Sequence, residues 1–291
     1  MTICADDAHL TPEEKQERVH EVFQKISEDY DRMNSIISLG RQDAWKRALV
    51  RSVTALRPRA VLDVASGTGD IALRLARVLP QARIVASDFS ENMLAVAARR
   101  IEAAGVETIE ISCQDAMRMS FPDASFDAVT ISFGLRNMPD YQQVIEQCVR
   151  VLRPGGMFAC LDASYPTNPV VRPFFHLYFA HLMPWMGKVL VHAPDEYQWL
   201  ADSTEAFLTK PELARLMENC GLGAVSYRSF MLGAAALHTG IKGVPVKGAV
   251  SVAAQRVLAP VPVSAQAAQN MVPPARFERA TPALGELCSI P

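Results

Sequence analysis

The sequence predicts an α/β fold with a mostly parallel, seven-stranded sheet that carries helices on both faces. Between Arg59 and Asp162, short β-rich runs alternate with stretches of helical periodicity. Parallel strands need crossover connections of this kind. Two further β runs, 224–230 and 234–241, are joined through Gly233, which predicts an antiparallel C-terminal addition to the sheet.

The first 57 residues are predicted to form a helical cap ahead of this sheet. Thr11-Pro12-Glu13-Glu14 has the form of a helix start, with a capping threonine, a proline in the first turn and a glutamate that can close a capping box. A second helix is expected over roughly 42–56.

The sheet domain is predicted to span residues 58–242, with strands and helices in alternation. The first five strands are expected at Ala60–Ala65, Arg83–Ser87, Thr108–Ser112, Ala128–Ser132 and Met157–Leu161. The helices between them are expected at Ile71–Leu79, Glu91–Ala104 and Gln142–Leu152. Arg153-Pro154-Gly155-Gly156 predicts a turn before the fifth strand. A capped helix, Thr209–Cys220, precedes the last two β runs.

Two segments depart from this alternation. Residues 165–205 are aromatic and rich in methionine, and they are expected to form a helical lid insertion. Beyond residue 243 no periodicity survives, so the tail 243–291 is predicted to be disordered. Its last part resembles the product of a reading frame that has run into a transfer-RNA gene.

The bulk charge and cysteine pattern exclude several classes of function. A formal net charge of -2 provides no global basic field for nucleic acid. Six scattered cysteines without a C-x-x-C pair favour a reducing compartment and argue against both a disulfide framework and a zinc cluster. His176 and His181 lack a third ligand at suitable spacing, so no metal site is expected. The N-terminus has no signal-peptide pattern, and a cytoplasmic location is expected.

The run from Val61 to Asp70 predicts a ligand site, because an apolar strand ends there in Gly67-Thr68-Gly69. Glycine lets the backbone approach a ligand, and ligands of open α/β sheets bind at the carboxyl ends of strands. The third glycine of a dinucleotide fingerprint is absent, and Asp63 and Asp70 would repel a pyrophosphate. S-adenosylmethionine fits better, since it has a sulfonium, an ammonium and no phosphate. Asp63 could favour its positive amino-acid end.

Two more strand ends carry acids that suit a nucleoside. Asp88 follows the second strand and could accept both ribose hydroxyls. Asp115 and Ala116 follow the third strand, where a carboxylate and a backbone amide could contact adenine. The alternative is that Asp88 and Asp115 only cap helices.

With these residues the chain resembles the class I S-adenosylmethionine-dependent methyltransferases, whose fold is Rossmann-like. More narrowly, it resembles the menaquinone and ubiquinone biosynthesis C-methyltransferase family over roughly residues 17–242. The resemblance rests on Tyr30-Asp31-Arg32-Met33-Asn34-Ser35, Trp45-Lys46-Arg47, Ile131-Ser132-Phe133-Gly134-Leu135-Arg136-Asn137, Arg153–Gly156 and Tyr197-x-x-Leu200 with Ser203. It implies cofactor positions at Thr68, Asp88, Asp115, Ala116 and Ser132. The family often has Asn where Asp115 stands and Glu where Asp162 stands.

The resemblance implies methyl transfer from S-adenosylmethionine to a ring carbon of a prenylated quinol. Arg136 is then expected to stabilise the developing phenolate, Asn137 to orient a hydroxyl and Tyr30 to close the site. The alternative for Arg136 is a structural salt bridge to Asp140 or to an N-terminal acid. For Tyr30 the alternative is a packed aromatic ring.

Three stretches, Ser90–Met93, Asn137–Asp140 and Tyr197–Ser203, favour demethylmenaquinol as substrate over a ubiquinone precursor. A non-catalytic cofactor-binding subunit of a quinone-synthesis complex is the alternative from another class. Within the lid, 173–191 could line an apolar tunnel or contact the inner face of the membrane, where the lack of acids suits anionic lipids. A packed lid or a homodimer face is the alternative for that segment.

Overall fold

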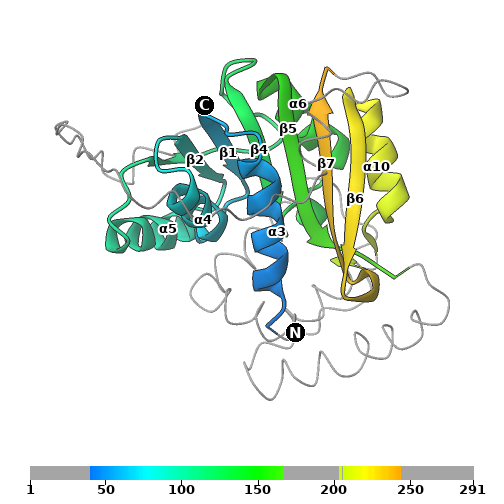
Figure 1. Cartoon of the computed structure of the whole chain (residues 1–291), viewed down its shortest axis with the longest axis horizontal. Helices are drawn as coiled ribbons and strands as arrows, with labels where there is room; N and C mark the ends of the chain where they lie inside the picture. Colours follow the sequence, from blue (N-terminus) through cyan, green and yellow to red (C-terminus); the bar gives the residue numbers. More distant parts are fainter. Residues whose placement is uncertain (1–39, 167–202, 205, 244–291) are drawn as a thin grey trace, which may run out of the picture.

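The computed structural model describes residues 40–166, 203–204 and 206–243. Tyr30, the helix start at Thr11, most of the lid and nearly all of the tail lie outside these residues. The described part forms a seven-stranded sheet with the strand order β3-β2-β1-β4-β5-β7-β6 (Figure 1). The predicted fold class is therefore confirmed.

The strands follow the predicted runs closely. Their bounds are β1 Ala60–Val64, β2 Arg83–Asp88, β3 Ile109–Cys113, β4 Phe126–Ser132, β5 Leu152–Ala163, β6 Leu222–Phe230 and β7 Ala235–Lys242. Strand β7 runs antiparallel to both of its neighbours, whereas the other neighbouring strands pair in parallel. The antiparallel addition at the C-terminal side is thus confirmed.

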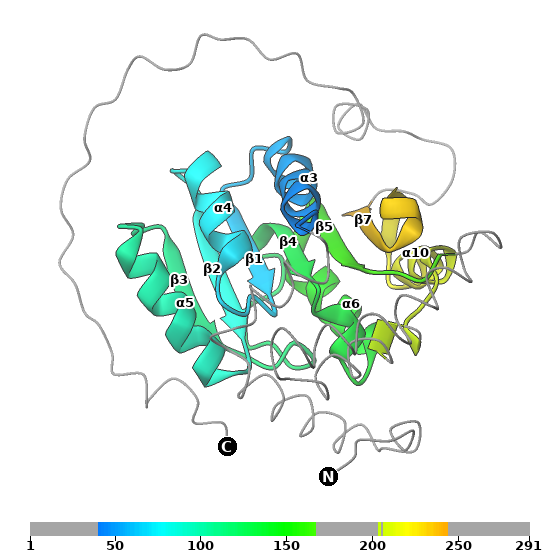
Figure 2. The same cartoon turned by 90° about the horizontal axis from the view of Figure 1, so that it is seen from below.

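Helices cover both faces of the sheet and define two cores. The helices are α3 Gln42–Thr54, α4 Asp70–Val78, α5 Glu91–Ala103, α6 Tyr141–Val151 and α10 Lys210–Asn219. Buried residues of α3, α4 and α5 share one core, and those of α6 and α10 share the other. Figure 2 shows α3 and α4 on one side of the sheet and α6 on the opposite side.

Helix α3 packs directly on the sheet. Its residues Trp45, Leu49 and Val53 are buried in the same core as residues of α4 and of the central strands. The Trp45 ring also stacks on Phe230, with a centroid distance of 6.1 Å. These contacts place residues 42–54 over β5 and β7 and beside α4. The boundary at residue 57 between cap and sheet domain stays a prediction.

The predicted turn Arg153–Gly156 lies inside β5. Phe126 of β4 pairs with Leu152, but Ala128 pairs with Met157, so the ladder shifts register at this point. Gly155 has a φ of +81°, which suits glycine. Because Leu152 already pairs with β4, strand β5 begins before the predicted turn. Residues 153–156 are therefore an irregularity within β5 and not a turn that precedes it.

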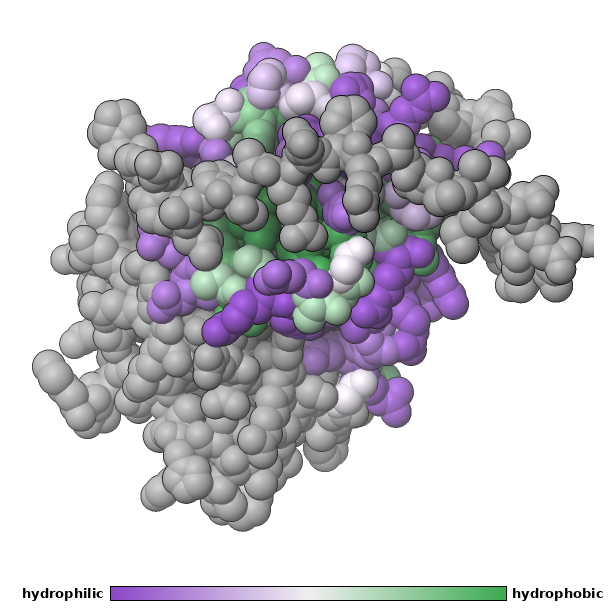
Figure 3. Space-filling model, turned by 90° about the vertical axis from the view of Figure 1, so that its left-hand side faces the viewer, coloured by the Kyte–Doolittle hydropathy of each residue, from purple (hydrophilic) through white to green (hydrophobic). Residues whose placement is uncertain are grey.

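Seen from the edge of the sheet where α5 lies, the described surface is mostly hydrophilic, with apolar groups in a central band (Figure 3). None of the helices in the described ranges has the length and apolar character needed to span a bilayer.

Candidate active site

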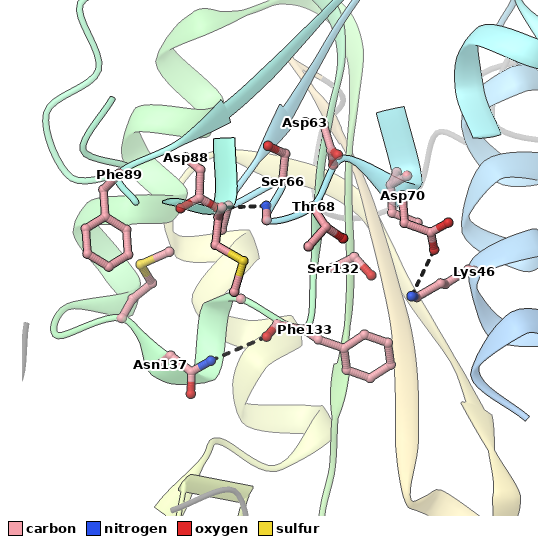
Figure 4. A pocket seen from close by; sticks show the side chains of 16 residues that line it. Lys46, Asp63, Ser66, Thr68, Asp70, Asp88, Phe89, Ser132, Phe133 and Asn137 are labelled. Atoms are coloured by element: carbon pink, nitrogen blue, oxygen red, sulfur yellow. Dashed lines mark hydrogen bonds and ion pairs between the residues drawn. The ribbon is translucent and has the colours of Figure 1, made fainter. Parts of the chain in front are cut away.

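A cleft opens at the carboxyl ends of β1, β2 and β4. It encloses about 730 Å³, with the open solvent at its mouth included. Its walls come from the turn after β1, the end of β2, the segment after β4 and Lys46 of α3 (Figure 4). A smaller hollow of about 390 Å³ shares five residues with this cleft and reaches the segment after β3. The two together form an elongated site.

Strained backbone shapes the floor of the cleft. Ala65 and Phe133, which follow β1 and β4, have φ values of +50° and +58°. Left-handed φ values are rare outside glycine and persist where the surrounding structure enforces them. Gly134 is required beside them, because a Cβ on Gly134 would lie 2.7 Å from Cβ of Ala65. The ends of β1 and β4 can therefore approach each other closely.

Asp63 lies almost fully buried at the base of the cleft, with an exposed fraction of 1%. Thr130 donates a hydrogen bond of 2.6 Å to its Oδ1, while its Oδ2 has no partner among the described residues. Burial raises the pKa of Asp63 to about 7 against the effect of the Thr130 bond, and the nearby Asp70 and Asp88 carboxylates add to the rise. A positively charged ligand group would stabilise its ionised form.

The glycine turn and Asp88 are tied together. The Gly67 N–H donates to Oδ2 of Asp88 at 2.8 Å, and the Ser90 N–H donates to Oδ1 at 3.0 Å. Asp88 lines both the cleft and the smaller hollow, so its carboxylate lies beside the predicted ribose position. Gly67 has a φ of +54°, and an added Cβ would meet no atom within 4 Å. The backbone here leaves space for a ligand.

Asp88 also contributes to the start of α5, since its bond to Ser90 holds the residue that caps this helix. The capping alternative and the ligand-binding prediction are therefore compatible. For Asp115 the capping alternative is wrong: the described stretch between β3 and β4 contains no helix, and the Oδ1 of Asp115 accepts the Met117 N–H at 2.8 Å within a turn. Asp115 and Ala116 line the smaller hollow together with Asp88.

Four buried side-chain atoms in the cleft have no hydrogen-bond partner within the described ranges. They are Asp63 Oδ2, Ser66 Oγ, Ser132 Oγ and Asn137 Oδ1. A buried polar atom without a partner costs about 1–3 kcal/mol. Such atoms concentrated in one cleft indicate a polar ligand. Thr68 also lines the cleft, but its hydroxyl accepts a 2.6 Å hydrogen bond from Arg100.

Arg136 is paired inside the protein. Its Nη1 lies 2.6 Å from Oδ1 of Asp162 and donates to the Phe133 carbonyl at 2.8 Å. Arg136 lines neither cavity, and its exposed fraction is 3%. The structure corrects the partner considered for a salt bridge: it is Asp162, because Asp140 instead accepts the Gln143 N–H as the N-cap of α6. The catalytic role of Arg136 stays a prediction.

Asn137 lines both the cleft and the smaller hollow. Its Nδ2 donates to the Phe133 carbonyl at 3.4 Å. In Figure 4 it lies on the opposite side of the cleft from Asp63 and Asp70. The hydroxyl-orienting role of Asn137 is a prediction, as is the closing role of Tyr30, which lies outside the described residues.

Sequence reasoning missed several lining residues. Lys46 belongs to a helix outside the strand–helix alternation, although Trp45-Lys46-Arg47 was one of the motifs that carried the resemblance. Apolar walls come from Ile71, Phe89, Met93, Phe133 and Met138. The positions of Phe89 and Phe133 directly after two parallel strands were the available signal. Among the residues described, no group of three or more His, Cys, Asp or Glu could hold a metal ion.

The fold and this site define an S-adenosylmethionine-dependent methyltransferase of the Rossmann-like class. The solved structure of an O-methyltransferase family protein from Burkholderia thailandensis has the same fold. Its TM-score is 0.54 at 19% identity, over 75% of this chain and 61% of that chain. Residues 11–242 match the model of the ubiE/COQ5 methyltransferase family, and the chain belongs to that family.

Curated relatives match over almost their whole length. One from Bacillus cytotoxicus, named demethylmenaquinone methyltransferase, is 43% identical over 78% of this chain and 97% of the relative. One of the same name from Geobacillus kaustophilus is 42% identical over 78% of this chain and 98% of the relative.

The residues present fit S-adenosylmethionine. Oδ2 of Asp63, which has no partner in the described part of the chain, suits an ammonium. Asp88 lines both the cleft and the hollow, where a ribose would join the two ends of the ligand. Among the described residues that line the cleft, Lys46 is the single Lys or Arg, and this lone cation disfavours a pyrophosphate there. The cofactor prediction is supported by this donor and acceptor set as well as by the family.

Proposed function

We propose that this enzyme transfers a methyl group from S-adenosylmethionine to a ring carbon of demethylmenaquinol and so forms menaquinol. The observation that carries the substrate is the identity of about 43% to demethylmenaquinone methyltransferases over 97% of their length. The cleft provides the cofactor half of the reaction, and its apolar wall provides a surface for a quinol ring.

Each part of the cofactor has a place in the elongated site. Asp63 faces the amino-acid end, the Gly67–Gly69 turn passes beside it, and Asp88 accepts the ribose hydroxyls. Asp115 and the Ala116 amide bind adenine in the smaller hollow. Ser132 contributes its unpartnered hydroxyl from the end of β4.

Bound S-adenosylmethionine supplies a sulfonium methyl that is already electrophilic. The protein must then hold the quinol ring carbon in line with that methyl and favour loss of a phenolic proton. Asn137 is placed to orient a quinol hydroxyl, since its Oδ1 has no partner among the described residues. Arg136 acts on the phenolate either by leaving its pair with Asp162 or by fixing the Phe133 carbonyl and, through it, Asn137.

The deciding experiment is an assay of the purified full chain with methyl-labelled S-adenosylmethionine. Demethylmenaquinol and 2-methoxy-6-polyprenyl-1,4-benzoquinol are supplied separately. Label is expected in menaquinol. Label only in the benzoquinol product would move the enzyme to the ubiquinone branch, and cofactor binding without transfer to either quinol would make the chain a non-catalytic subunit.

Arg136→Met tests the catalytic role in the same assay. We expect turnover to be abolished while affinity for S-adenosylmethionine stays near the wild-type value, because Arg136 does not line the cofactor cleft. Retained turnover in a folded variant would remove Arg136 from the catalytic residues.

We also propose that the enzyme contacts the membrane surface through residues 173–191, since a prenylated quinol is dissolved in the bilayer. The support is the composition of this segment, which has no acidic residue. Flotation with anionic liposomes, with and without demethylmenaquinol, tests it. Absence of flotation together with a dimer in analytical ultracentrifugation would assign the segment to a homodimer face instead.

A further inference from the structure

We propose that Lys46 binds the carboxylate of the cofactor's methionine moiety, and that Asp70 holds the lysine in place for this. The inference rests on the proposed cofactor and adds a residue that recognises one end of it. No strand-end motif contains this lysine, because it comes from α3, on the far side of the cleft from Asn137 (Figure 4).

The position of Lys46 is unusual for a lysine. Its side chain is 9% exposed, it lines the cleft, and its Nζ lies 2.9 Å from Oδ2 of Asp70. Lysine is almost never this buried unless it is paired, because burying an ammonium is costly. The ammonium has three donors, and Asp70 is its one charged partner within the described ranges. Donors therefore remain for a ligand.

Asp70 does not fully neutralise Lys46, because it shares its charge with a second cation. Nε of Arg74 lies 3.0 Å from Oδ1 of Asp70, and Arg74 also pairs with Asp43 at 2.6 Å. Burial opposes ionisation of Asp70, but the charges of Lys46 and Arg74 outweigh it and hold the pKa of this carboxyl below its usual value. A fixed, ionised Asp70 orients the lysine without cancelling its positive field in the cleft.

The charges of the cleft match the two charges of an amino acid. Asp63, Asp70 and Asp88 line it, and their carboxylates would repel a carboxylate, whereas Oδ2 of Asp63, which has no partner among the described residues, suits an ammonium. Among the described lining residues, Lys46 is the cation that can receive the carboxylate. Asp63 and Lys46 thus provide opposite charges for the two groups on the methionine α-carbon, which predicts selection of ligands that carry both.

The test compares ligands with and without the carboxylate by isothermal titration calorimetry on the full chain. S-adenosylhomocysteine has it, and decarboxylated S-adenosylmethionine lacks it. We expect Lys46→Met to weaken S-adenosylhomocysteine about 10- to 100-fold, the range for a hydrogen bond to a charged group. Binding of the decarboxylated ligand should be unchanged or tighter. Lys46→Arg should retain part of the preference.

Arg74→Met is the matched control, because Arg74 is the other cation that pairs with Asp70 and does not line the cleft. It should lower the preference for the carboxylate ligand much less than Lys46→Met does, because Lys46 stays in the cleft and only its share of the Asp70 charge grows. Equal loss of both ligands in Lys46→Met, or the same change of ratio in Arg74→Met, would overturn the role of Lys46. If Lys46→Met does not fold, Lys46→Met/Asp70→Asn removes the stranded acid and is titrated in its place.

The outcomes also separate this inference from the proposed function. If the wild-type chain binds neither ligand, the cofactor assignment fails and the role of Lys46 fails with it. If the wild type binds S-adenosylhomocysteine and the ratio does not respond to Lys46→Met, the cofactor assignment stands and the inference about Lys46 is wrong.

Discussion

Arg136 and Asp162 form a buried ion pair, with 2.6 Å between Nη1 and Oδ1 and exposed side-chain fractions of 3% and 2%. Asp162 also accepts the backbone N–H groups of Arg136 and Ala163. The pair joins the end of β5 to the short 3-10 helix Leu135–Asn137, which carries Asn137. It therefore stabilises the segment on which the predicted chemistry depends.

Arg136→Met should lower the free energy of unfolding by about 3–5 kcal/mol, because it leaves Asp162 charged, buried and unpaired. Urea unfolding followed by circular dichroism measures this. Arg153→Met is the control: it breaks a pair with Asp127 whose side chains are 45% and 28% exposed, and should cost at most about 1 kcal/mol. Equal losses in the two variants would show that burial does not set the strength of the Arg136 pair.

Gly134→Ala should destabilise the protein by about 1–3 kcal/mol, the usual cost of overpacking, and weaken S-adenosylhomocysteine binding. The added Cβ must displace Ala65, which lines the cleft. Gly221→Ala is the comparison: its φ is +93° and no atom would meet its Cβ, so it strains the backbone far from the cleft. Stability should fall in both variants, but affinity should fall only in Gly134→Ala. Unchanged affinity there would mean that Ala65 does not shape the bound site.

Asp63 should make the ligand-free protein less stable as the pH rises from about 4 to about 7. Its pKa is about 7 in the folded state against an ordinary 3.8, so the folded protein holds more protons in this interval. The stabilisation is complete below the ordinary pKa and lost as the pH passes the folded one.

Asp63→Asn removes this titration. The stability of the wild type relative to the variant should therefore fall between pH 4.5 and pH 7.5, by an amount on the order of a few kcal/mol at 1.36 kcal/mol for each unit of pKa shift. Urea unfolding of both proteins at each pH gives the difference between their free energies of unfolding. Groups that titrate alike in both proteins do not contribute to this difference. A difference that does not change with pH would contradict the raised pKa of Asp63.

Asp88→Asn should weaken S-adenosylhomocysteine about 10- to 100-fold, because a carboxylate acceptor for the ribose is replaced by an amide with one oxygen. Asp127→Asn is the matched control. Asp127 also accepts two backbone N–H groups, those of Arg59 and Ala60, but it lies at the opposite end of the parallel strands. We expect it to reduce stability and leave the affinity unchanged. A similar drop in affinity for both variants would point to a general loss of structure.

The sheet could be predicted because its central strands are buried along their length. All five residues of β1 are buried, so the run reads as a strand without alternation. The start of β4 was missed by two residues, since the polar Asp127 interrupts the apolar run after Phe126. Asp127 is tolerated in the strand because its carboxylate binds Arg153 and backbone N–H groups.

The strand-end part of the site could also be predicted, because parallel strands bring their carboxyl ends to one edge. Asp63, Gly67 and Asp88 meet there as expected. The partners of the charged groups could not be predicted. Arg136 finds Asp162, 26 residues along the chain, and Lys46 reaches the cleft from α3. The Arg136 pair depends on the conformation of the turn after β4, and the position of Lys46 on how α3 docks on the sheet, neither of which residue spacing encodes.

The position of β7 imposes an order on folding during synthesis. The last strand of the described sheet lies between β5 and β6, so β5 has no partner on that side of this sheet until residues 235–242 arrive. A nascent or truncated chain that ends before them presents the bare edge of β5, whose residues 156–162 are all buried in the finished sheet. Exposed apolar edges of this kind recruit other chains, so a ribosome that stalls early on this message would release an aggregation-prone fragment rather than a smaller working enzyme.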